Sequence, residues 1–233
     1  RANLGAGRLA SYGFTVEAAF GHHPTRYLIG RRLRGSVAVT SLFVLSPENL
    51  DGTHVRIVED LDARHCDVQT YVPTMKKAVR LVERYVFDCL PLTDVGYLDL
   101  MAWRYPRLGP PLDGAETDMS WSRWHSARHR RYPGPATTPG LTVTEAVDPD
   151  TGLVVARAVE RRREVVRRWE ILEMGEPDMV GLPRRVRATR RESGGWTEFH
   201  RVGRPVPVPD EEFEAAPGRL REALEGRLAA GVA

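Results

Sequence analysis

The sequence predicts a mainly β domain in which the chain runs back and forth through one antiparallel sheet. Apolar runs of about 6–10 residues recur along the chain, turn residues separate them, and few helical patterns intervene. The 233 residues are 42% hydrophobic and 28% charged, which is enough chain to bury a core and lies outside the disordered range. We therefore expect a single domain over residues 1–233, with ten or eleven strands and a few helices.

Strand patterns fill the first eighty residues. In Ser11–Phe20 every second residue is apolar, which is typical of a half-buried strand. The Asp51-Gly52 pair, inside a cluster of turn residues, indicates a hairpin. The other strands expected in this half are Arg26–Leu33, Val37–Leu45, Thr53–Glu59, Asp67–Val72 and Ala78–Val82.

The middle of the chain has a different character before strand patterns return. Thr93 or Asp94 can cap a helix over roughly Val95–Trp103. Residues 113–139 are polar, aromatic and bounded by prolines, and we interpret them as a lid or insert. Leucines spaced four apart predict a terminal amphipathic helix at about 217–230. The strands expected between these segments are Leu141–Val147, Leu153–Glu160, Arg167–Glu173, Pro183–Arg191 and Trp196–Arg201.

Composition excludes several classes of function. The net charge is only +3, and the 31 carboxylates are interleaved with the basic residues, so we expect no nucleic-acid binding. No apolar run is long enough for a transmembrane segment. Cys66 and Cys89 lack metal-ligand spacing, and no phosphate-binding or hydrolase motif occurs, so we expect neither a metal nor a cofactor.

Four short motifs stand out along the chain: Pro47 to Thr53, Tyr71 to Arg80, Val147 to Leu153 and Pro207 to Phe213. They resemble motifs of bacterial outer-membrane lipoprotein-sorting proteins of the LolA/LolB-like superfamily. The order and spacing of the motifs carry this resemblance, which extends from about Ser11 to Phe213, more than any one of them does. The sequence departs from the family pattern at Asp88-Cys89-Leu90, where relatives have Gly-Ser-Asp, and at Leu81, where they have a second arginine.

This resemblance implies an open, strongly curved half-barrel that wraps an apolar cavity, with helices closing its mouth. It also implies a ligand that is a hydrophobic small molecule or a lipid. Apolar and aromatic side chains would line such a cavity. The side chains we expect to contact a ligand are Tyr12, Phe14, Phe43, Phe87, Trp103, Trp121, Trp124 and Trp169.

The segment Trp121–His129 is the best candidate for a functional lid. Its tryptophans could cover an apolar ligand, and His125 and His129 could supply polar groups beside them. The alternative is a surface helix whose tryptophans pack on the sheet. Runs such as Arg161-Arg162-Arg163 are interpreted as solvated strand faces.

Two functions remain open from the sequence. The preferred hypothesis is a cofactor-independent cyclase of polyketide-like natural-product biosynthesis, in which shape and a few polar groups promote the reaction. Its expected catalytic residues are Tyr71, Tyr97, His125 and Arg104. The alternative is a carrier of lipids or lipoprotein acyl chains.

Two features of the sequence favour the cyclase. Of the 34 basic residues only Lys76 and Lys77 are lysines, which indicates a GC-rich, actinobacterial-type source. In such a source a lipoprotein carrier would have no outer membrane as its destination. No export signal or anchoring cysteine is visible, so a cytoplasmic location is expected, or an exported one if a signal preceded Arg1.

Overall fold

The computed structural model describes residues 3–20, 23–90, 93–112 and 119–231 and contains one large β-sheet. The strands are β1 (Ser11–Phe20), β2 (His23–Arg34), β3 (Val37–Ser46), β4 (His54–Asp60), β5 (His65–Tyr71), β6 (Ala78–Arg80), β7 (Arg128–Pro133), β8 (Leu141–Val147), β9 (Val154–Arg161), β10 (Glu164–Glu173), β11 (Arg185–Arg190) and β12 (Trp196–Pro207). The helices are α1 (Glu83–Val86) and α2 (Pro217–Gly231), with short 3-10 turns η1 (Glu48–Leu50), η2 (Pro73–Met75), η3 (Tyr97–Leu100), η4 (Pro177–Met179) and η5 (Asp210–Glu214).

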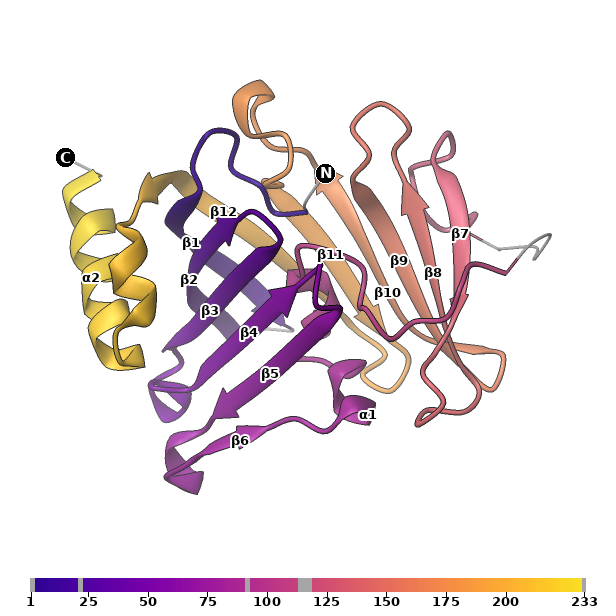
Figure 1. The fold of residues 1–233 in the computed structure, drawn as a ribbon, viewed down its shortest axis with the longest axis horizontal. Helices are drawn as coiled ribbons and strands as arrows, with labels where there is room; N and C mark the ends of the chain where they lie inside the picture. The colour runs from indigo at the N-terminus through magenta and orange to yellow at the C-terminus, as the bar shows by residue number, and fades with distance from the viewer. Residues whose placement is uncertain (1–2, 21–22, 91–92, 113–118, 232–233) are drawn as a thin grey trace.

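All neighbouring strands are antiparallel, in the order β6-β5-β4-β3-β2-β1-β12-β11-β10-β9-β8-β7. The first and last strands pair at the centre of the sheet, so each half of the chain builds one half of the sheet (Figure 1). The edge strands β6 and β7 are not paired with each other, so the sheet stays open. The predicted mainly β, open antiparallel fold is confirmed.

The sheet has 12 strands, whereas ten or eleven were expected and eleven were located in the sequence. The additional strand is β7, which lies inside the segment interpreted as a lid. Among its side chains only Tyr132 is buried, because β7 is an edge strand, so it lacks the apolar alternation that predicts a strand. Residues 113–118 of the expected lid lie outside the described residues.

The described residues form two separate core clusters, and the larger one lies mainly on the inner face of the sheet. The inner face carries Tyr12, Phe14 and Val16 of β1, and its core runs through both halves of the sheet. The outer face carries the alternate residues of the central strands, and α2 covers them with Leu220 and Leu224. Because side chains alternate along a strand, this assignment fixes which residues point to each face.

α2 packs closely against the sheet because two of the residues beneath it are glycines. A Cβ at Gly13 would lie 2.3 Å from Leu224 Cδ2, and one at Gly30 would lie 2.9 Å from Leu224 Cδ1. The terminal helix therefore packs on the outer face, beside β1, β2 and β3 (Figure 1). The resemblance implied helices that close the mouth of the half-barrel, and α2 is not in such a position. Among the described residues, no helix is both long and apolar enough to cross a bilayer.

Candidate functional site

The inner face is the candidate site, but the chain itself fills most of it. A cavity of about 40 Å³ remains between the sheet and residues 95–100. Such a space holds a water molecule or two and is far below the roughly 300 Å³ of a small-molecule pocket. Its apolar lining includes Phe14, Val16, Ile29, Trp169, Val186 and Phe199.

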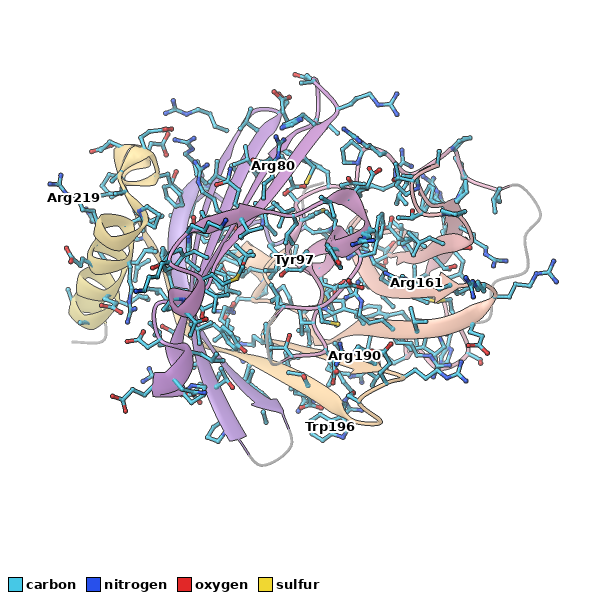
Figure 2. The ribbon with its side chains drawn as sticks, turned by 90° about the horizontal axis from the view of Figure 1, so that it is seen from below. Arg80, Tyr97, Arg161, Arg190, Trp196 and Arg219 are labelled. Atoms are coloured by element: carbon cyan, nitrogen blue, oxygen red, sulfur yellow. The ribbon has the colours of Figure 1, made fainter. Side chains whose placement is uncertain are left out.

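Residues 93–103, which we call the inner segment, occupy the space that a ligand would need. Tyr97, Leu98 and Met101 are at most 5% exposed and belong to the inner core. Figure 2 shows Tyr97 near the middle of the molecule, between the two halves of the sheet. The predicted helix over Val95–Trp103 is reduced here to the single turn η3.

Buried charges hold the inner segment against the second half of the sheet. Asp99 is fully buried and forms ion pairs with Arg157, at 2.8 Å, and with Arg167. Arg157 also forms an ion pair with Glu145 at 3.0 Å, and the side chains of all four residues are at most 4% exposed. We call Asp99, Glu145, Arg157 and Arg167 the inner ionic cluster.

The backbone of the inner segment is bound by further charged side chains. Arg157 donates a hydrogen bond to the carbonyl oxygen of Leu98 at 2.8 Å, and Arg31 donates one to that of Leu100 at 2.7 Å. Glu59 accepts hydrogen bonds from the N–H groups of Ala102 and Trp103 at 2.8 and 3.1 Å. Because these carbonyl oxygens accept hydrogen bonds from side chains, the segment does not need to continue as an α-helix to satisfy them.

Burial shifts the titration of several groups on this face. It raises the pKa of Tyr12 and of Tyr97 to about 12, so both phenols stay protonated at neutral pH. The Tyr12 hydroxyl donates to the carbonyl oxygen of Leu4. Burial also raises the pKa of Glu59, against the opposing effects of Arg31 and of the two N–H donors.

The raised pKa of Glu59 predicts a pH-dependent contribution to stability. A carboxyl group whose pKa is higher in the folded protein contributes stability below its unfolded-state pKa, and loses it as pH rises through the folded-state value. We therefore expect Glu59→Gln to remove part of the decline in unfolding free energy above about pH 4.3. Urea unfolding of both proteins between pH 4 and 8 measures this difference, and parallel stability curves would contradict it.

The structure divides the predicted ligand-contacting residues among four places. Tyr12, Phe14 and Trp169 lie on the inner face, and Phe87 is buried in the same core. Phe43 packs in the outer core under α2. Trp103 is half-buried next to Glu59, and the remaining two tryptophans lie in the segment that precedes β7.

The expected lid tryptophans lie on the outer side of β10. Trp121 stacks near the guanidinium of Arg168, at 5.3 Å, and Arg168 points away from the face that carries Trp169. Trp124 is half-buried and donates from Nε1 to the carbonyl oxygen of Ile171 at 2.8 Å. Both rings pack against the larger core cluster, but neither is among the residues that line the inner cavity.

The four expected catalytic residues are not brought together. Tyr71 lies on the outer face of β5, whereas Tyr97 lies inside the inner core. His125 is exposed, and the exposed Arg104 guanidinium lies 4.6 Å from the ring centroid of Tyr132. The described residues include no group of three or more His, Cys, Asp or Glu side chains that could hold a metal ion.

Sequence reasoning missed the charged residues that hold the inner segment. A signal was present, because Arg31 continues the alternation of Tyr27 and Ile29 on β2. Arg157 likewise falls at an inward position between Val155 and Val159. A charge at an inward position of an apolar strand indicates a buried partner, because an unpaired buried charge is too costly.

Comparison of the structure with solved structures shows that the chain has the LolA-like fold. A structure described as an outer membrane lipoprotein-sorting protein domain from Vibrio parahaemolyticus matches with a TM-score of 0.66 at 12% identity, covering 88% of this chain and 89% of that one. A DUF1329 family protein from Desulfovibrio piger matches with a TM-score of 0.60 at 15% identity, covering 87% and 88%. A LolA superfamily protein from Nitrosomonas europaea matches with a TM-score of 0.56 at 14% identity, covering 88% and 90%.

At the level of sequence, neither a family model nor a curated protein matches the chain. The structural matches are at low identity, so they establish the fold and confirm the resemblance noted in the sequence.

Proposed function

We propose that the protein is a carrier that holds an acyl chain or another lipid against the inner face of its sheet. The observation that supports this most directly is an inner face of apolar side chains on a sheet with the LolA-like fold. One protein of this fold is described as a lipoprotein-sorting domain, and another as a LolA superfamily member. Burial of apolar ligand surface would provide the binding free energy.

Binding requires the inner segment to move, because the free cavity of about 40 Å³ cannot hold an acyl chain. The ligand would replace the apolar contacts of Tyr97, Leu98 and Met101 with the sheet. The polar bonds that hold this segment would set how much of the protein is open to ligand. The apparent affinity for the ligand is the affinity of the open state multiplied by the fraction of protein that is open.

No feature of the described residues favours the cyclase hypothesis over the carrier. The four groups expected to polarise a substrate lie at separate places, and two of them, His125 and Arg104, are exposed. A carrier needs only a binding face, so the carrier is the better supported of the two. The cyclase remains a prediction, which is tested by asking whether the bound molecule is recovered chemically unchanged.

Trp169 offers a direct test of where the ligand binds. It is 5% exposed and lines the inner cavity, so a bound acyl chain would lie against its ring. We expect a fatty acid brominated in mid-chain, dibromostearate, to quench tryptophan fluorescence in the wild type. Trp169→Phe should remove most of that quenching while equilibrium dialysis shows that the ligand still binds.

Trp196→Phe is the matched control, because Trp196 is 50% exposed and points from β12 to the outer face. This variant should keep the ligand-dependent quenching. Absence of binding, or quenching that survives in Trp169→Phe, would argue against an acyl chain on the inner face.

A further inference from the structure

A second pocket lies on the opposite side of the sheet, between the first turn of α2 and strands β3 to β6. Its volume is about 380 Å³, which falls within the range of small-molecule sites. Its floor is a row of residues that face one another across the strands, Phe43 opposite His54, His54 opposite Tyr71, and Tyr71 opposite Ala78. We call this space the outer pocket; its other lining residues include Gly52, Arg56, Gln69, Pro217 and Arg221.

His54 is the polar group at the base of the outer pocket. The residue is 8% exposed, and its ring stacks on Phe43 with centroids 4.6 Å apart and planes 17° apart. Its Nε2 atom is buried and has no hydrogen-bond partner among the described residues. Burial lowers the pKa of His54 to about 4, so the imidazole is neutral at physiological pH and can carry its proton on Nε2.

Positive charge lies beside this unpartnered nitrogen. Arg56 follows His54 by two residues on the same face of β4, so their Cα atoms are about 7 Å apart. No carboxylate of the described residues forms an ion pair with Arg56 within 4.0 Å. Arg221, by contrast, has its charge balanced by Asp51 and Glu225.

We propose that the outer pocket binds a small amphipathic carboxylic acid. The apolar body would lie against Phe43, Tyr71 and Pro217, and the carboxylate would accept hydrogen bonds from His54 Nε2 and from the Arg56 guanidinium. Such a ligand provides the partner that the buried nitrogen lacks and a direct ion pair for Arg56, whose charge otherwise acts at longer range on Glu214. The pocket is on the face opposite the proposed acyl-chain site, so this inference does not depend on the carrier function.

Decanoate is a suitable probe, and the imidazole C–H resonances of His54 in proton NMR spectra are a local readout. The His54 resonances are identified among those of the seven histidines because they are missing from the spectrum of His54→Phe. We expect decanoate to shift the His54 resonances of the wild type with a saturable dependence on concentration. Arg56→Gln should weaken this binding about tenfold, as the loss of one charge-assisted hydrogen bond implies.

Two further comparisons test the apolar wall and the acid group. Ala78→Trp places a large side chain in the pocket from an exposed position on the edge strand, so it should abolish the shift without unfolding the protein. Decanol, which lacks the charge, should bind the wild type about tenfold more weakly than decanoate. Arg130→Gln is the matched control, because Arg130 is an exposed arginine on β7, at the far end of the sheet, and it should leave decanoate binding unchanged.

The proposal is overturned if decanoate does not shift the His54 resonances, if Arg56→Gln and Ala78→Trp leave the shift unchanged, or if decanol binds as tightly as decanoate. Quenching of Trp169 by dibromostearate without any decanoate shift at His54 would support the carrier function and reject the outer pocket. A decanoate shift at His54 without quenching of Trp169 would support the outer pocket and reject the carrier function.

Discussion

Replacing Asp99 by asparagine should lower the free energy of unfolding by about 3–5 kcal/mol, because it removes the carboxylate that two buried guanidiniums share. Arg157 would keep Glu145 as a partner, but Arg167 would have no carboxylate within ion-pair distance among the described residues. An uncompensated buried charge is far more costly than the intact pair is stabilising. Urea unfolding followed by circular dichroism gives the difference directly.

Two comparisons make this prediction specific to the inner ionic cluster. Asp150→Asn changes an exposed aspartate in the turn between β8 and β9, and it should alter stability by less than about 0.5 kcal/mol. Adding Arg167→Met to Asp99→Asn should recover part of the loss, because the unpaired charge is then gone. If Asp99→Asn behaves like Asp150→Asn, the cluster does not hold the inner segment.

The alternation of apolar residues predicts eleven of the twelve strands, and each of these except the edge strand β6 contains buried residues. This alternation does not show which face of a strand points toward the inner core. Both faces of β3 are buried, one against the inner core and the other under α2, so its sequence alternates between two apolar sets. For this reason the sequence predicts Phe43 on the inner face, whereas the residue lies on the outer face.

Pattern alone could not reveal the closed state of the candidate site. In the sequence, Asp99 lies inside the segment expected to form a helix, and Arg157 and Arg167 lie within two of the expected strands. Their role depends on contacts between residues more than fifty positions apart, which no local spacing encodes. The apolar character of the inner face was accessible from sequence, and the inward charges could have been noticed, but the partners that these charges bind could not be deduced.

The same cluster connects stability to the proposed binding function through Gly96. A Cβ at this position would lie 2.0 Å from Nη1 and 2.2 Å from Cζ of Arg167. We expect Gly96→Ala to displace the guanidinium from Asp99 and to lower the free energy of unfolding by about 2–4 kcal/mol. Because the inner segment is then held less firmly, the open state gains population, and dibromostearate should bind about tenfold more tightly.

Gly226→Ala separates this effect from a general response to replacing glycine. Gly226 lies within α2, and a Cβ there would meet no neighbouring side chain or strand within 4 Å, so alanine should raise helix stability by up to about 1 kcal/mol. Binding of dibromostearate should stay unchanged in this control. A loss of stability in Gly96→Ala with no gain in binding would mean that the inner segment is part of a permanent core, because loosening it would then expose no site for an acyl chain.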